Sequence, residues 1–321
     1  MSQVQTRTVD QDDGELRLDR WFKRHFPTLG HGRLEKLLRT GQVRLNGKRA
    51  AASDRVAPGD AIRVPPLPQA EPARPPRQAP PVDERDAKEL RGRVLYRDRD
   101  ILAIDKPAGL AVQGGSKTTR HLDAMLDALK FDAKDRPRLV HRLDKDTSGV
   151  LVLGRTAAAA SRLAALFRGR DLKKVYWAVV VGVPTPEAGD IRLPLAKRIG
   201  RPGEGEERMV VDEEEGQSAR TLFRTLDAAG SKVALLELEP LTGRTHQLRV
   251  HCAELGTPIL GDGKYGGAEA ILPIGEFARS LHLHARRLEI PGANGKRIVI
   301  EAPLPRHMRD TLEFFGLNPS A

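Results

Sequence analysis

Cysteine is nearly absent from this chain, which has 321 residues and a single cysteine at Cys252. One cysteine excludes an internal disulfide and a zinc site built from cysteines. Long apolar runs are absent as well, because none approaches the roughly 18 residues that a membrane-spanning helix needs. The N-terminal segment MSQVQTRTVDQDDGE lacks the apolar core of a secretory signal. We therefore expect a protein of the reducing cytoplasm with no membrane attachment.

Motifs that bind nucleotides or metals are also missing. The sequence contains no P-loop and no dinucleotide-binding fingerprint. Four histidines in its second half could suggest a zinc site, but they lack the spacing of known metal sites: His246, His251, His282 and His284. We therefore expect neither a nucleotide cofactor nor a metal.

Positive charge is what the chain has in excess, with a formal net charge of +11. Between Leu16 and Val64 there are twelve lysines and arginines against four acids, which is +8 of that total. Such an excess of positive charge within about fifty residues is typical of a surface that binds a polyanion such as RNA. The alternative is a surface whose charge serves solubility alone.

Residues 15–64 are predicted to form a compact N-terminal unit, preceded by a polar, frayed segment at 1–14. Apolar residues at 16, 18, 21 and 22 suggest an amphipathic helix, and Arg33–Thr40 a second helix that stops at Gly41. Asn46-Gly47 between short apolar runs is a strong hairpin signal, and Ala61–Val64 is expected to form a further strand.

The Pro-rich segment PPLPQAEPARPPRQAPP at residues 65–81 cannot build a core and is predicted to be an extended spacer. The sequence therefore divides into an N-terminal domain at 15–64, a linker at 65–88 and a larger domain at 89–321.

The larger domain is predicted to be an α+β structure. Helices are expected at 121–130, 157–168 and 245–255, and strands at 94–96, 101–104, 150–153, 175–181, 233–238 and 281–290. A charged, glycine-containing insertion at 200–216 is expected to be an exposed loop or hairpin. Because several strands follow one another directly, a mixed, largely antiparallel sheet is expected instead of repeated βαβ units.

The stretch Leu139–Arg155, LVHRLDKDTSGVLVLGR, sets charged residues in a turn between apolar runs. Such a turn can hold catalytic side chains on a rigid frame, although its residue types also form ordinary turns. Asp144 and Asp146 are both candidate catalytic carboxylates, and composition does not separate them.

A second stretch, Leu241–Cys252, LTGRTHQLRVHC, contains a predicted helix that Thr245 could cap. Arg244 and Arg249 are natural partners for a carboxylate or a phosphate. The alternative is a helix whose basic residues only contact RNA. Tyr176, on a predicted strand, is either a core residue or a third candidate for the site.

The N-terminal unit resembles the S4 RNA-binding domain, through Arg17-Leu18-Asp19, Arg33 to Gly41, Val43 to Gly47 and Gly59-Asp60. The resemblance implies an RNA-binding role for its basic residues, namely Arg17, Arg33, Lys36, Arg39 and Arg44. His31-Gly32-Arg33 stands where the family often has Ser-Arg-Ser, so the usual helix cap is not expected here.

HRLDKDTSG and LTGRTHQLRVH together resemble the RluA-type pseudouridine synthases. Lys106-Pro107-Ala108-Gly109, Lys174-Val175-Tyr176, Gly261-Asp262 and Tyr265-Gly266 extend the match from Val94 to about Leu304. The resemblance implies the pseudouridine synthase fold and the isomerisation of uridine to pseudouridine in RNA without a cofactor.

The same resemblance assigns roles residue by residue. It implies that Asp144 acts on the sugar, that Arg249 pairs with Asp144, and that Tyr176 stacks on the uracil and serves proton transfer. Arg142 would fill the place vacated by the flipped base. Substrate contacts are implied for Arg244, His246 and Leu248. Gly261, Asp262 and Tyr265 are interpreted as structural.

The expected partner is 23S ribosomal RNA or an assembly intermediate of the large subunit, bound by a monomer. Two classes of alternative stay open. A non-catalytic RNA-binding assembly factor would not need a buried acid. A metal-dependent nuclease would need clustered acids, and the run Glu213–Glu215 falls in a predicted loop.

Overall fold

The structure is a computed structural model that describes residues 4–67, 83–114, 120–169, 171–198, 207–273, 279–292 and 295–319. It divides into two compact units, Met1–Pro80 and Pro81–Ala321, each of which is described by itself. Most of the predicted proline-rich linker lies at 68–82, outside the described residues, as does the first part of the predicted insertion, at 200–206.

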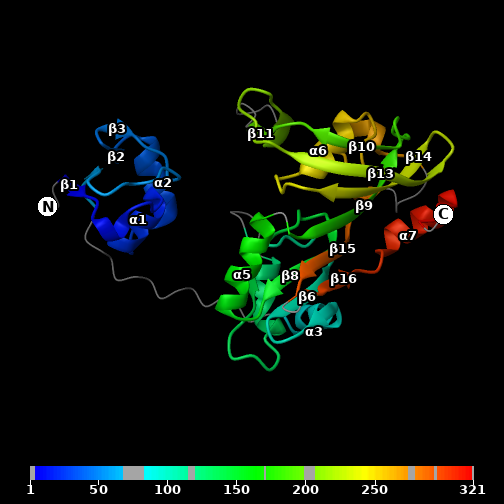
Figure 1. The fold of residues 1–321 in the computed structure, drawn as a ribbon, viewed down its shortest axis with the longest axis horizontal. Coiled ribbons are helices and arrows are strands. Elements are labelled where there is room, and N and C mark those ends of the chain that lie inside the picture. The colour runs from blue at the N-terminus through cyan, green and yellow to red at the C-terminus, as the bar shows by residue number, and fades with distance from the viewer. Residues whose placement is uncertain are drawn as a thin grey trace. The chain divides into compact units, whose positions relative to one another are not determined.

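The first unit packs two helices against a four-stranded sheet of order β1-β4-β2-β3 (Figure 1). Its elements are β1 (Gln5–Thr8), η1 (Gln11–Asp13), α1 (Leu18–His25), α2 (His31–Arg39), β2 (Arg44–Leu45), β3 (Lys48–Arg49) and β4 (Ala61–Val64). Trp21 and Phe22 of α1 and Leu34 and Leu38 of α2 form its core together with Ile62 of β4. Both predicted helices and the strand at 61–64 are therefore present.

The prediction that residues 1–14 are frayed was wrong for β1. Gln5–Thr8 pairs antiparallel with β4, Gln5 opposite Val64 and Thr8 opposite Ala61. All four side chains are exposed, so no apolar alternation marks the strand in the sequence. Backbone hydrogen bonds to β4 define it instead.

The second unit is built on a ten-stranded sheet. Its main path runs β10-β13-β14-β9-β15-β8-β6-β5, with β16 beside β15 and β7 beside β8. The strands are β5 (Val94–Arg97), β6 (Ile101–Lys106), β7 (Arg138–Leu139), β8 (Ser148–Gly154), β9 (Lys173–Val181), β10 (Ala188–Arg192), β13 (Arg220–Ala229), β14 (Val233–Pro240), β15 (Leu283–Pro291) and β16 (Arg297–Glu301). All the pairs are antiparallel except β15 with β8, so the expected mixed, largely antiparallel α+β fold is confirmed.

A separate two-stranded sheet pairs β11 (Leu195–Arg198) with β12 (Arg208–Val211). The helices of the second unit are α3 (Glu84–Gly92), α4 (Leu122–Met125), η2 (Leu126–Leu129), α5 (Ala157–Arg168), α6 (Gln247–Glu254), η3 (Gly267–Ala270) and α7 (Arg306–Phe315). The predicted bounds of α5 agree with the structure. α3 begins inside the segment predicted as linker, because Asp83 caps it by accepting a hydrogen bond from the amide of Arg85. No helix in the described ranges is long and apolar enough to cross a membrane.

The apolar core of the second unit consists of several clusters spread along the sheet. β9 and β15 are central strands of this sheet (Figure 1). One cluster gathers around Leu102, Leu126 and Leu151, and another around Leu236 and Leu283. Tyr176 of β9 packs against both clusters. The two motif stretches meet on the sheet near this residue.

Candidate active site

The loop that carries Asp144 is held in place where it enters β8. Ser148 and Gly149 pair in parallel with His284 and Ala285 of β15. Gly149 has φ +107°, and a Cβ atom on it would lie 2.3 Å from the carbonyl oxygen of Ala285. Only glycine allows the two backbones to come this close. The contact with β15 therefore fixes the backbone directly after the loop.

A buried lysine ties the other side of the same loop. The Lys106 ammonium is fully buried and donates to the carbonyls of Pro107 (2.8 Å), Leu110 (2.9 Å) and Lys145 (2.9 Å). Burial lowers its pKa to about 8, while the carboxylates of Asp146 and Asp144 oppose that shift. Lys106 therefore fixes the peptide between the two candidate acids and places a positive charge behind them.

His141 supports the loop from within. Its Nε2 accepts a hydrogen bond of 2.9 Å from the amide of Val152, and its ring stacks on Phe167 with centroids 3.9 Å apart. Burial, with the charge of Lys174 adding to it, lowers the pKa of His141 to about 3. The ring is therefore neutral near pH 7 and acts as an acceptor.

The second motif starts its helix later than predicted. Thr245 does not cap it, because α6 begins at Gln247 and its N-cap residue is His246, which has left-handed backbone angles (φ 53°, ψ 18°). The Gln247 side chain stabilises this bend by accepting hydrogen bonds from Thr242 Oγ1 (2.7 Å) and the amide of Arg244 (3.1 Å). The bend turns the His246 ring towards the Asp144 loop.

The two motifs and β9 enclose a cavity of about 360 Å³. It brings together all seven residues for which catalysis or substrate contact is predicted: Arg142, Asp144, Tyr176, Arg244, His246, Leu248 and Arg249. Asp144 also lines an adjoining hollow of about 610 Å³, together with Asp146 and Lys264. Asp146 is exposed and is not part of the smaller cavity.

The predicted ion pair between Arg249 and Asp144 is not formed within the described residues. Arg249 instead forms a bidentate pair with buried Asp262, at 2.8 Å from Nε and 2.7 Å from Nη2. Although burial lowers the pKa of Arg249, the hydrogen bonds that it donates to Asp262 and the charges of Asp262 and Asp144 together raise it above its ordinary value. Asp262 therefore orients Arg249 and keeps it charged near Asp144.

Within the described residues, the Asp144 carboxylate has a titratable neighbour in His246, whose Nε2 lies 3.9 Å from Oδ1. Burial lowers the pKa of His246, and the charge of Asp144 opposes that shift. The Nδ1 of the same ring lies 2.6 Å from the Tyr265 hydroxyl. Neither Asp262 nor Tyr265 was predicted as a site residue, although both stand in the matched segment GDGKYG. Their contacts depend on how the chain folds after α6, which no local pattern reveals.

Tyr176 lines the cavity from β9 and packs against two apolar clusters. Burial raises the pKa of its hydroxyl, and the charge of Asp144 raises it further. The phenol therefore keeps its proton at neutral pH and presents both a ring face and a hydrogen-bond donor.

Arg142 and Arg244 differ from buried Arg249 in having exposed side chains at the edge of the cavity. Arg142 donates from Nη2 to Thr245 Oγ1 at 3.3 Å, and Arg244 donates from Nε to the carbonyl of Ser218 at 3.1 Å. Both contacts are with neutral oxygens. The two guanidinium groups therefore remain able to bind an anionic ligand.

The basic residues predicted to bind RNA lie in the first unit. Arg33, Lys36 and Arg39 are exposed on α2, while Leu34 and Leu38 of the same helix are buried. Arg17 and Arg44 are exposed as well; Arg17 pairs with Asp19 and Arg44 donates to the carbonyls of Gly41 and Gly47.

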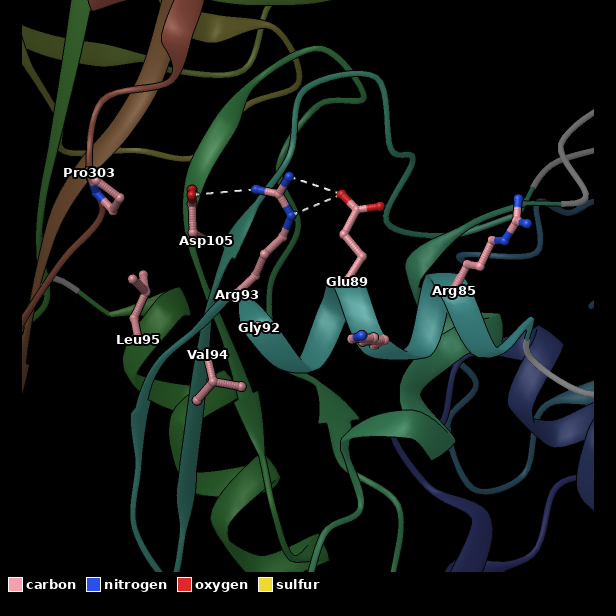
Figure 2. Close-up of a pocket in the computed structure, with 9 residues that line it drawn as sticks. Arg85, Glu89, Gly92, Arg93, Val94, Leu95, Asp105 and Pro303 are labelled. Atoms are coloured by element: carbon pink, nitrogen blue, oxygen red, sulfur yellow. Dashed lines mark hydrogen bonds and ion pairs between the residues drawn. The ribbon is translucent and has the colours of Figure 1, made fainter.

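Another hollow of about 690 Å³ lies between α3 and β5 (Figure 2). Its acids are already bridged, since Arg93 contacts Glu89 at 2.9 Å and Asp105 at 3.7 Å (Figure 2). Among the described residues, no cluster of three or more histidine, cysteine or acidic side chains could hold a metal ion. The cavity around Asp144 is therefore the candidate active site.

Comparison with known proteins gives consistent matches. A family model described as RNA pseudouridylate synthase matches residues 100–254. The chain is 36% identical to ribosomal large subunit pseudouridine synthase C of Rickettsia felis, over 92% of this chain and 95% of that protein. It is 34% identical to RNA pseudouridine synthase 4, mitochondrial, of Arabidopsis thaliana, over 93% of this chain and 79% of that protein. The solved structure of human RNA pseudouridylate synthase domain containing 4 matches with a TM-score of 0.61 and 34% identity, covering 72% of this chain and 95% of that one.

Proposed function

The chain belongs to the RluA-type family of RNA pseudouridine synthases, and from this premise we propose that it converts specific uridines of 23S ribosomal RNA to pseudouridine. The reaction breaks the bond between C1′ and N1, turns the uracil and joins C1′ to C5. C5 loses a proton and N1 gains one, so the reaction is an isomerisation that needs neither a redox partner nor a group donor. The observation that carries the proposal is the single cavity that holds Asp144, Tyr176 and Arg249 together.

We assign the sugar chemistry to Asp144. Its carboxylate either adds to C1′ or assists an elimination that gives a glycal, and the proposal holds for both routes. Arg249, fixed by Asp262, supplies the positive charge that keeps a carboxylate ionised in an enclosed site. Asp146 is the less suitable acid, because it is exposed outside the smaller cavity.

Tyr176 is the residue proposed to hold the detached uracil. Its ring can stack on the base, and its protonated hydroxyl can exchange a proton with it. Leu248 and His246 complete the wall of the cavity and exclude water from the base. If the uracil stays stacked on Tyr176 after the C1′–N1 bond breaks, it has only to rotate within the cavity before the C1′–C5 bond forms.

A base in folded RNA is out of reach until it is flipped out of its stack. Arg142 is exposed at the cavity mouth, two residues before Asp144. Its flat guanidinium suits stacking between the bases left behind. Arg244, beside it, is proposed to contact a phosphate.

The first unit is proposed to be an S4-like RNA-binding domain. Its exposed basic residues on and around α2 would contact phosphates, which adds affinity and orientation more than base recognition. This role accounts for the concentration of positive charge in residues 16–64.

The relatives support a C-type enzyme of the large subunit, because the matches in Rickettsia felis and Vibrio cholerae carry that name. The D type, which acts at other uridines, is the alternative. A monomer in the cytoplasm of a bacterium, acting without a cofactor on 23S ribosomal RNA or on an assembling subunit, completes the proposal.

The decisive experiment is to map pseudouridines on 23S ribosomal RNA after incubation with the protein and with an Asp144→Asn variant. We expect discrete new pseudouridines that are absent with the variant, and their positions would choose between the C and D types. No modification on either naked RNA or precursor subunits would favour a non-catalytic assembly factor. Activity that persists in Asp144→Asn but is lost in Asp146→Asn would move the nucleophile to Asp146.

A further inference from the structure

A chain of polar contacts, two of them hydrogen bonds, leads from the β11–β12 hairpin to the candidate nucleophile. The amide of Met209, in β12, donates to the Tyr265 hydroxyl at 3.2 Å. That hydroxyl lies 2.6 Å from His246 Nδ1, and His246 Nε2 lies 3.9 Å from Asp144 Oδ1. Lys264 Nζ also donates to the carbonyl of Glu207 at 2.7 Å, which ties the Tyr265 loop to the same hairpin.

The direction of this chain follows from its donors. A backbone amide can only donate, so the Tyr265 oxygen is the acceptor towards Met209. The hydroxyl keeps one proton that it can donate to His246 Nδ1, and in this arrangement Nδ1 accepts through its lone pair. In a neutral imidazole the remaining proton is consequently on Nε2, the nitrogen that faces Asp144.

The position of the His246 ring is also imposed by the fold. The residue has φ 53°, a left-handed conformation that is uncommon outside glycine. Its ring packs edge-on against Tyr265, with centroids 5.5 Å apart and an interplanar angle of 78°. Burial lowers its pKa, so the ring is neutral near pH 7. An uncommon backbone conformation that is held by a specific side-chain contact, as at His246 with Tyr265, is typical of residues positioned for a function.

We propose that Tyr265 is a positioning residue that holds His246 in the Nε2–H tautomer and so directs a neutral hydrogen-bond donor at Asp144. This inference rests on the proposed function, in which Asp144 acts on the sugar. Such a donor would set the orientation of the carboxylate, for which no hydrogen bond is formed within the described residues. At 3.9 Å the contact is longer than a hydrogen bond, and the proposal requires it to shorten to one in the complex with RNA, as catalytic contacts commonly do.

Tyr265 also has a packing role that must be separated from this one. Its ring lies under the Arg249 guanidinium at 5.0 Å and near that of Arg208 at 5.4 Å. Tyr265→Phe keeps the ring and removes only the hydroxyl. Tyr96→Phe is the matched control, because the Tyr96 hydroxyl donates to Asp98 Oδ2 at 2.8 Å in a part of the unit that does not line the cavity.

The kinetic test measures kcat and KM for pseudouridine formation on an RNA fragment that contains the mapped site. We expect Tyr265→Phe to lower kcat about tenfold with KM nearly unchanged, since a misplaced catalytic group loses rate and not substrate affinity. Tyr96→Phe should leave both parameters unchanged. An unchanged kcat in Tyr265→Phe overturns the proposal.

A second pair of variants tests which nitrogen of His246 matters. The amide of glutamine places its nitrogen near the position of Nε2, whereas the amide of asparagine places it near Nδ1. We expect His246→Gln to retain several-fold more activity than His246→Asn. Equal activities in the two variants would mean that donation to Asp144 is not the role of His246.

The tautomer itself is measurable without any activity, from the side-chain nitrogen-15 shifts of His246 in the full-length protein, assigned with His246→Gln. We expect Nδ1 unprotonated and Nε2 protonated in the wild type, and a mixture of tautomers in Tyr265→Phe. A protonated Nδ1 in the wild type overturns the inference. If the wild type makes no pseudouridine, the proposed function fails, and the tautomer measurement alone then decides this inference.

Discussion

At the scale of single residues, the site depends on side chains that hold other side chains. Asp262 orients Arg249 with two hydrogen bonds, and Lys106 fixes the peptide that joins the two acids. These supporting groups are buried, so their loss would leave charges or carbonyls without partners. The positions of the Arg249 guanidinium and of the peptide beside Asp144 are therefore set in advance of substrate binding.

Gly149 gives the clearest residue-scale prediction. In Gly149→Ala the new methyl group would overlap the carbonyl of Ala285, and the backbone would keep an unfavourable positive φ. We expect the free energy of unfolding to fall by about 3 kcal/mol from strain and overlap together, and pseudouridine formation to fall with it. Urea denaturation measures the first effect.

Gly92→Ala is the matched control for this change. A Cβ atom on Gly92, at the end of α3, meets nothing within 4 Å. This variant should be neutral or slightly more stable, because alanine is the better helix residue. Equal stability of the Gly149 and Gly92 variants would show that the β8–β15 contact can relax, contrary to our expectation.

At the scale of elements, the sequence predicts helices and strands whose apolar residues recur with a clear period. It does not predict elements that are defined by pairing with residues far away in the chain. α5 and β4 are evident from periodicity and turn signals. β1 is not, because its four exposed side chains carry no pattern. The motif residues were expected near one another and do share a cavity. The partner of Arg249 was misassigned because Asp262, thirteen residues further on, reaches it only through the turn that follows α6.

α2 provides the element-scale prediction. If its exposed face contacts phosphates, the double variant Arg33→Gln/Arg39→Gln should weaken RNA binding and reduce the slope of log affinity against log salt by about one to two units. The catalytic rate at saturating RNA should be unchanged. Binding measured by filter retention at several salt concentrations gives the slope.

The control for α2 carries the same charge change on another helix. Arg306→Gln/Arg309→Gln removes two exposed arginines from α7. It should leave the salt slope nearly unaltered. If both double variants reduce the slope equally, the effect belongs to overall charge and not to the first unit.

At the scale of the whole molecule, buried neutral histidines make stability depend on pH. Burial lowers the pKa values of His282 and His284 to about 4 from an ordinary 6.5. The unfolded chain takes up protons near pH 6.5, but the folded second unit does so only near pH 4. Stability from these groups is therefore complete above pH 6.5 and is lost as the pH falls from 6.5 to 4.

We expect each of these histidines to account for on the order of 3 kcal/mol of that loss. The chain offers a direct readout, because its two tryptophans, Trp21 and Trp177, lie in different units. In a Trp21→Phe background, fluorescence during urea unfolding reports on the second unit. A His282→Asn variant should show a shallower pH dependence, and a midpoint that stays constant between pH 6.5 and 4.5 would contradict the prediction.

The ring of three carbonyls around the Lys106 ammonium has one further consequence. Three carbonyls converging on one positive charge resemble the way proteins coordinate a monovalent ion. Here the ion is tethered to its own binding site through a side chain, so its effective concentration does not change with the medium. Dilution and competing salts cannot remove it. The loop that holds Asp144 thus has a counterion that is always bound, because the ammonium group is covalently attached to the chain.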